Sequence, residues 1–207
     1  ATEPKRELLT PDEAYAEISA QLLVHKLNPR THDGTWRAKI CDMIYMMSQQ
    51  PIDVFGLRED QTHDDAGPLG EIHFARHKTG VAIILEMNED LRHLVDWFRT
   101  FKRQQGIISP HLMVYPSYFD KRSRHQPVKH RFMQLSWAQA CKDAGYGGQY
   151  QLRDLRKKGL TDEFVSQGEN NKGGHQTEAM RRHYRLITPP ERSRSTLKSI
   201  PSVKPKP

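Results

Sequence analysis

The sequence has only two cysteines and no long apolar run. Cys41 and Cys141 are too few for a disulfide framework in a chain of 207 residues, which predicts free thiols in a reducing compartment. No stretch approaches the ~18 uncharged apolar residues of a membrane-spanning helix, and the opening residues, ATEPKRELLT, do not form a signal peptide. The sequence therefore predicts neither secretion nor membrane insertion, and a cytoplasmic location.

The motifs of several enzyme classes are missing as well. The sequence contains no GxxxxGK[ST] or GxGxxG phosphate loop, no GxSxG serine elbow and no HExxH zinc motif. His73 and His77 are four residues apart, but in a predicted strand they lie roughly 13 Å apart and cannot share one ion. We therefore expect no cofactor and no metal site.

Positive charge is in excess. Lys and Arg total 32 against 25 Asp and Glu, which gives a formal net charge of +7. This excess favours a polyanionic partner, either nucleic acid or an acidic membrane face. The hydrophobic content of 36% and the length fit one folded core, in one or two lobes, rather than a disordered chain.

Helical signals cover most of the chain. Thr10 is the predicted N-cap of the first helix, with Pro11 at its first position and Glu13 closing a capping box. Asn88 caps a later helix that Gly106 ends. In order, the predicted helices span about 9–23, 35–49, 51–57, 89–105, 129–144, 152–167 and 176–186.

One part of the chain changes to strand-like periodicity. Residues 71–77 and 81–87 alternate as strands and are joined by KTG, which is favourable for a hairpin turn. The order is therefore helices, one hairpin, then helices, which predicts a mostly α, α+β domain. An apolar stripe at helical spacing predicts the core of the second helix: Trp36, Ile40, Met43, Ile44 and Met47.

Cations gather in two later segments. LRDLRKK places Arg153 and Arg156 three residues apart on one face of a predicted helix. MRRHY places two arginines just before Tyr184. Taken alone, the first segment reads as a solvated basic face and the tyrosine as an ordinary amphipathic residue.

Four segments, taken together and in order, resemble the conserved boxes of the tyrosine recombinase (phage integrase) family. QLRDLR resembles its HxLR box, with Arg156 at the arginine, and GGHQTEAMRRHY resembles its LGH…Y box, with His175 and Tyr184 at the matching separation. HKTG puts Lys78 where the family keeps its hairpin lysine. SQQPIDVFGLRED resembles the box of the first family arginine, whose place is taken by Gln50.

The resemblance covers about residues 8–187 and implies the family's catalytic domain, a helical bundle with a small antiparallel β-hairpin or sheet on one side. Residues 1–7 would then be an N-terminal extension. Residues 188–207, rich in Pro, Ser and Lys, would form a flexible basic tail. The family's N-terminal core-binding domain is expected to be absent.

The chemistry implied by the resemblance is site-specific DNA recombination or integration. Tyr184 would attack a phosphodiester to give a 3′-phosphotyrosyl enzyme, while Arg156 and His175 hold the phosphate and Lys78 protonates the leaving 5′-oxygen. Such a reaction needs neither metal nor ATP.

Two positions depart from the family pattern. Gln50 is neutral where the family has an arginine, and loss of one such transition-state donor typically costs about 10²–10³ in rate. Arg153 stands where the family has a histidine, and it cannot act as a base because arginine does not deprotonate in proteins. It could, however, restore the charge lost at Gln50.

The partner implied by the resemblance is double-stranded DNA with an attachment-type site, bound by a homo-oligomer, with no membrane involved. A bacterial or phage-encoded, nucleoid-associated protein fits this partner. Two alternatives stay open: a catalytically impaired DNA-binding relative, and a basic helical module that binds RNA or protein. The expected DNA contacts are Lys78, Arg153, Arg156, Lys157, Arg181 and Arg182.

Overall fold

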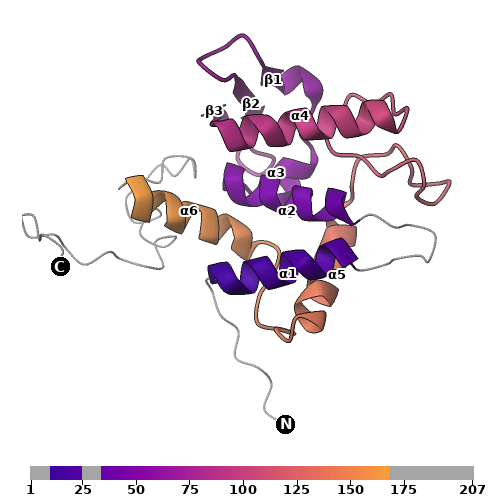
Figure 1. The fold of residues 1–207 in the computed structure, drawn as a ribbon. Helices are drawn as coiled ribbons and strands as arrows, with labels where there is room; N and C mark the ends of the chain where they lie inside the picture. The colour runs from indigo at the N-terminus through magenta and orange to yellow at the C-terminus, as the bar shows by residue number, and fades with distance from the viewer. Residues whose placement is uncertain (1–9, 25–33, 168–207) are drawn as a thin grey trace, which may run out of the picture.

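The computed structural model describes residues 10–24 and 34–167, and the expected helix at 176–186 lies outside these ranges. The structure is mostly helical, with a small antiparallel sheet on one side next to α4, which confirms the predicted fold class (Figure 1). The elements are α1 (Asp12–Val24), α2 (Thr35–Met47), α3 (Pro51–Phe55), the 3₁₀ turn η1 (Glu59–Gln61), β1 (Thr62–His63), β2 (Glu71–Ala75), β3 (Ala82–Glu86), α4 (Glu89–Gln104), α5 (His130–Asp143) and α6 (Asp154–Gln167).

Helix α2 is the centre of the packing. It contacts α1, α3, α4 and α6, with α4 and the sheet on one side and α1, α5 and α6 on the other (Figure 1). The predicted core stripe is confirmed, since all five of its residues are buried: Trp36, Ile40, Met43, Ile44 and Met47. Cys41 and Cys141 are also buried, and both thiols are free, as expected.

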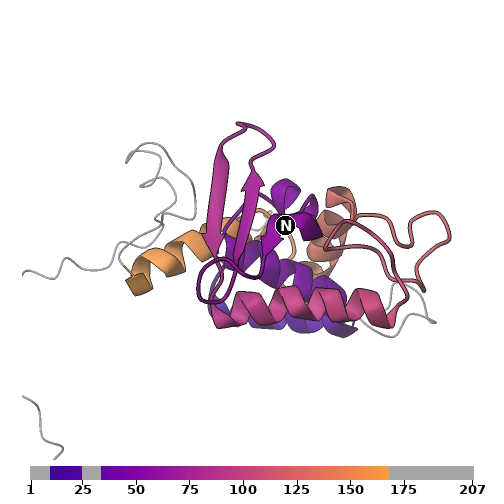
Figure 2. The same cartoon turned by 90° about the horizontal axis from the view of Figure 1, so that it is seen from above.

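The sheet has the order β1-β2-β3 and is antiparallel throughout. Its β2–β3 ladder pairs Glu71 with Glu86 at one end and Ala75 with Ala82 at the other, which confirms the predicted hairpin. The hairpin stands out from the helical body (Figure 2). Strand β1 was not predicted, because a two-residue strand is too short to show a period.

The helix caps agree with the prediction in one case and not in the other. The Asn88 side chain accepts the Leu91 N–H at 2.9 Å, and Gly106, at φ +63°, follows the end of α4, as predicted. The Thr10 capping box is wrong: the Thr10 hydroxyl has no hydrogen-bond partner among the described residues. Pro11 instead supplies the carbonyl that accepts the first helical N–H, so Thr10 lies one residue too early to cap α1.

Close packing against α2 and an ion cluster hold α6 in place. A Cβ added at Gly159 would lie 2.2 Å from the Tyr45 carbonyl oxygen, so only glycine allows the two helices to approach this closely. Next to it, the buried Lys158 ammonium pairs with Asp12 and donates to Asp162 at 3.0 Å. The Asp162 carboxylate also accepts the Tyr45 hydroxyl at 2.9 Å. These contacts fix the first turns of α6, which carry the candidate arginines.

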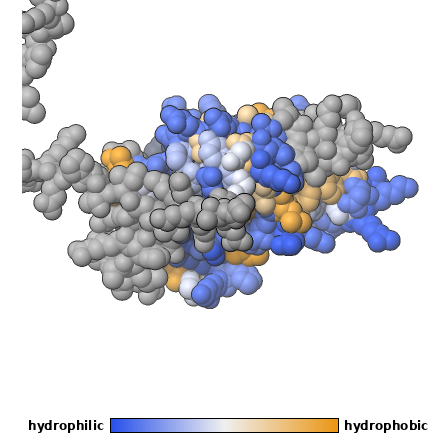
Figure 3. Space-filling model, turned by 90° about the horizontal axis from the view of Figure 1, so that it is seen from below, coloured by the Kyte–Doolittle hydropathy of each residue, from blue (hydrophilic) through white to orange (hydrophobic). Residues whose placement is uncertain are grey.

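The described surface is mainly polar. Seen from the end formed by α1 and α5, hydrophilic side chains predominate, with smaller apolar patches between them (Figure 3). Within residues 10–24 and 34–167, no helix is both long and apolar enough to cross a membrane.

Candidate functional site

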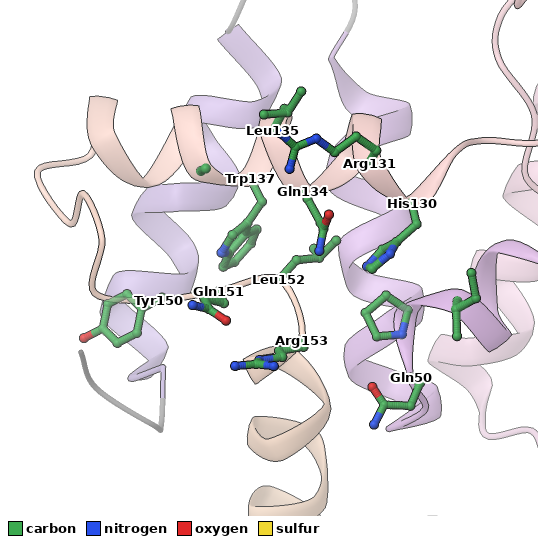
Figure 4. Close-up of a pocket in the computed structure, with 13 residues that line it drawn as sticks. Gln50, His130, Arg131, Gln134, Leu135, Trp137, Tyr150, Gln151, Leu152 and Arg153 are labelled. Atoms are coloured by element: carbon green, nitrogen blue, oxygen red, sulfur yellow. The ribbon is translucent and has the colours of Figure 1, made fainter. Parts of the chain in front are cut away.

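A cavity of about 510 Å³ lies where α3, α5 and the start of α6 meet (Figure 4). Gln50, the residue before α3, lines it on one side, and Arg153, the residue before α6, lines it on another. The first turns of α5 contribute His130, Arg131 and Gln134. The structure thus brings together the two positions that depart from the recombinase pattern.

The backbone positions Gln50 and Arg153 at the starts of their helices. Gln50 is the extended N-cap of α3, and its carbonyl accepts the Asp53 N–H at 2.9 Å. The buried Asp154 carboxylate accepts the Gln151 N–H at 2.7 Å, which closes the turn that presents Arg153. Gln50 is half-buried and Arg153 is exposed, so the cation is the more accessible of the two.

Arg156 occupies the first turn of α6 and is only 4% exposed. Lys158 is buried as well, and Lys157 is half-buried, 3.8 Å from Asp154. The interpretation of this segment as a solvated basic face therefore holds for Arg153 but is wrong for Arg156 and Lys158, which the packing of α6 against α2 buries. Arg156 is not among the residues that line the 510 Å³ cavity.

Lys78 lies at the exposed tip of the β2–β3 hairpin, outside the lining of this cavity. The tip is attached to α3, since the His77 N–H donates to Asp53 at 2.8 Å. At the base of the turn, Arg76 donates to the Gln49 side chain at 3.3 Å. The hairpin that carries Lys78 is therefore hydrogen-bonded to the segment that contains Gln49, Gln50 and the start of α3.

The remaining predicted site residues are His175, Arg181, Arg182 and Tyr184, and all four lie outside the described residues. Their distances to the cavity are therefore not part of this geometry. No group of three or more His, Cys, Asp or Glu side chains in residues 10–24 and 34–167 is arranged to hold a metal ion.

Sequence reasoning missed the contribution of α5. Burial lowers the pKa of His130, which keeps this imidazole neutral near pH 7 at the edge of the cavity. Arg131 is exposed beside it. The local signal for these residues is the cation run in VKHR at the start of the predicted helix 129–144, but their packing against α3 has no local signature.

No protein-family model matches the sequence, and no curated protein matches it significantly. Solved structures do match. A lambda integrase dimer bound to a COC′ core site has a TM-score of 0.62 and 18% identity, with 97% of this chain and 52% of that chain covered. XerH site-specific recombinase bound to palindromic difH substrate has a TM-score of 0.67 and 9% identity, with 90% and 51% covered.

The lambda integrase catalytic core matches over 88% of this chain and 91% of that chain, with a TM-score of 0.56 and 14% identity. The chain spans about half the length of the integrase and XerH chains above but nearly all of this core. This chain therefore has the fold of the tyrosine recombinase catalytic domain, as the resemblance predicted.

Proposed function

We propose that residues 8–187 form the catalytic domain of a site-specific DNA recombinase, which breaks and rejoins DNA through a 3′-phosphotyrosyl intermediate at Tyr184. The observation that carries this proposal is the shared cavity of Gln50 and Arg153. These residues belong to two recombinase-like boxes far apart in the sequence, and they line one cavity in a chain with the recombinase fold. The neighbours supporting DNA as the substrate were solved bound to DNA.

The proposed reaction exchanges one phosphate ester for another. The Tyr184 hydroxyl oxygen forms a bond to phosphorus and gives up its proton to solvent water, while the bond from phosphorus to the 5′-oxygen breaks. Lys78 gives a proton to the leaving 5′-oxygen. Because the ester linkage is retained in the covalent intermediate, the 5′-hydroxyl of a second strand can reverse the reaction without ATP or metal.

Cations stabilise the transition state in this mechanism. Arg156 holds the non-bridging oxygens in the planar, forked geometry that lysine cannot supply, and His175 donates a hydrogen bond to the same phosphate. Arg153 replaces the charge that Gln50 lacks. Its exposed guanidinium on the cavity that Gln50 lines supports this role.

The same cations form the proposed DNA contacts, together with Lys157, Arg181 and Arg182. We expect assembly as a homo-oligomer on an attachment-type site, because a lambda integrase tetramer was solved bound to a Holliday junction and a dimer to a core site. A bacterial or phage-encoded, nucleoid-associated protein remains the setting that suits this function.

A second candidate function is DNA binding without cleavage. The specific observation in its favour is that Gln50, a neutral side chain, faces the cavity where the family has an arginine. Loss of one transition-state donor costs about 10²–10³ in rate, which could leave binding as the main activity.

The deciding experiment traps the covalent intermediate. Duplexes with randomised cores are first selected for binding to the protein, and the bound duplexes are then nicked beside each candidate cleavage position. A short fragment diffuses away after attack, so the protein stays attached and appears as a denaturant-resistant adduct. Tyr184→Phe is the test variant, and Tyr118→Phe is the control, since Tyr118 is an exposed tyrosine outside the predicted site.

An adduct that Tyr184→Phe removes and Tyr118→Phe retains supports the recombinase. No adduct from the parent chain, but one from Gln50→Arg, supports the impaired relative. If the selected duplexes bind and neither protein forms an adduct, the cleavage function is wrong.

A further inference from the structure

A second cavity adjoins the first one. It measures about 690 Å³ and lies between α3, the tip of the β2–β3 hairpin and the segment that joins α4 to α5. Ile52 and His130 line both cavities, so the two adjoin each other and are called the joined cavities below. Arg122 and Lys129 line the second cavity, with His77 from the hairpin tip.

The lining of both cavities is entirely without carboxylates among the described residues. Arg131 and Arg153 line the first cavity and Arg122 and Lys129 the second, and all four side chains are exposed. Asp120 is near Arg122, but its carboxylate accepts backbone N–H groups in its own turn. The joined cavities therefore present four exposed cations and no acidic side chain in their lining.

Cations elsewhere in the structure are arranged differently. On α4, Arg99 pairs with Asp64 at 2.8 Å and with Glu59 at 3.2 Å, and Lys102 pairs with Glu59 at 2.6 Å. Arg92 pairs with Asp64 at 3.2 Å. On this face, acidic side chains neutralise the cations of α4. The excess positive charge of the chain, +7 in all, is therefore distributed unevenly, and the joined cavities are one place where cations are concentrated.

The segment that carries Arg122 and Lys129 is firmly held. Phe119 stacks on Tyr115 with ring centroids 4.6 Å apart and meets Phe132 edge-on at 5.3 Å. The Tyr115 hydroxyl accepts the Lys129 N–H at 3.1 Å. Aromatic packing under the loop fixes the positions of its exposed cations, so a ligand would not have to order them first.

Hydrogen bonds close the same loop on itself. The Ser117 hydroxyl donates to the Gln105 carbonyl at 2.6 Å and lies 2.8 Å from His125 Nε2. His125 adopts a left-handed conformation at φ +66°, which is uncommon for a residue other than glycine. A strained position that is kept in an otherwise well-bonded loop is typical of a functional surface.

We propose that residues 117–131 form a second DNA-binding element, in which Arg122 and Lys129 bind duplex phosphates beyond the one cleaved. The inference rests on the proposed function, since its partner is the substrate DNA. A duplex carries regularly spaced negative charges over a long surface, which matches cations spread along two adjoining cavities better than a single small anion does. Phosphate contacts of this kind position the duplex without reading its sequence.

The test compares two double variants of equal charge. Arg122→Gln/Lys129→Gln removes the two cations of the segment that line the second cavity, and Arg103→Gln/Lys142→Gln removes two exposed cations that line neither cavity. Binding to a fluorescent duplex is measured by anisotropy at several salt concentrations, and melting temperatures check that both variants fold.

We expect the loop variant to bind about 10- to 100-fold more weakly at ~0.1 M salt, with the slope of log K against log salt flatter by about 2. The control should change binding only about 2-fold, through its charge alone. Equal losses in both variants, or no loss in the loop variant, would overturn the inference while leaving the recombinase proposal intact. A parent chain that binds no DNA duplex even at low salt overturns both this inference and the recombinase proposal. The same measurement is made with an RNA duplex, and if the loop variant loses affinity for RNA but not for DNA, RNA replaces DNA as the partner of this segment.

Discussion

Gln50 and Arg153 line one cavity, although one precedes α3 and the other precedes α6. Each occupies a position where the recombinase pattern has another residue. In the proposed function, a neutral side chain and an added cation would then stand in place of an arginine and a histidine within one site. The simplest physical account is that the charge has moved from one wall of the cavity to another.

A charge that has moved predicts a non-additive pair of substitutions. Arg153→Gln should lower the rate of adduct formation about 10²–10³-fold in the parent chain. In a Gln50→Arg background the same change should cost at most about 10-fold, because the restored arginine already supplies the donor. Single-turnover rates on the trapped substrate measure all four corners of this cycle. Equal losses in the two backgrounds would show that the two side chains act independently.

Gly159 should tolerate no side chain. A Cβ there would lie 2.2 Å from the Tyr45 carbonyl oxygen and 2.4 Å from the Ser48 hydroxyl oxygen, so Gly159→Ala must push α6 away from α2. We expect a loss of about 1–3 kcal/mol in the free energy of unfolding, even though alanine favours helices. Urea unfolding measures it.

Gly147→Ala is the matched control, because the nearest atom to its added Cβ would be 3.7 Å away. That variant should change the free energy of unfolding by less than about 1 kcal/mol. An equally stable Gly159→Ala protein would contradict the close approach of the two helices.

Lys158 should matter more for stability than an exposed lysine. Its side chain is 4% exposed and joins Asp12 to Asp162, so Lys158→Met leaves the Asp162 carboxylate with the Tyr45 hydroxyl as its remaining donor in the cluster. The expected cost is about 1–3 kcal/mol. Lys39→Met removes a 3.7 Å pair from a lysine that is 38% exposed and should cost less than about 0.5 kcal/mol. Similar thermal midpoints for the two variants would argue against the cluster.

Stability should fall at alkaline pH because of the two buried thiols. Burial raises the pKa of Cys141 to about 12, and burial also raises the pKa of Cys41 well above its ordinary value. The unfolded chain loses these protons near pH ~8.5 and the folded chain keeps them, so the stabilisation is complete below that pH and is lost as pH rises toward about 12.

Urea midpoints at about pH 7 and about pH 9.5 test this dependence. The Cys41→Ala/Cys141→Ala variant should be less stable at the lower pH but should lose less on going to the higher one. Rapid alkylation of either thiol in the folded parent chain would contradict their burial.

Local sequence signals predicted the elements whose stabilising contacts are themselves local. The apolar stripe of α2, the KTG turn of the hairpin and the Asn88 cap each depend on neighbours within a few residues, and all three are confirmed. The Thr10 cap failed because a shift of one residue changes which carbonyl begins the helix, and composition does not resolve such a shift.

Features that depend on distant partners could not be predicted in this way. Arg156 and Lys158 look solvated in the sequence, and only the packing of α6 against α2 buries them. The segment 117–131 looks like a plain polar loop, yet Phe119 packs it against Tyr115 and Phe132. For the candidate site, the order of the residue types could be read from the sequence, while the common cavity of Gln50 and Arg153 is visible only in the fold.

The hairpin has a ladder of its own and is attached near its tip through the bond from His77 to Asp53. The hairpin is therefore a self-contained structural unit. Its turn could be exchanged for that of another protein without changing the rest of the sheet, provided that the Asp53 carboxylate still accepts a backbone N–H from the new turn. Asp53→Asn should loosen the attachment of the hairpin tip to α3. Asparagine keeps the shape of the side chain but weakens the charge-assisted hydrogen bond from the His77 N–H. In the proposed mechanism, Asp53 would thus influence the position of Lys78 through the backbone of the neighbouring residue His77.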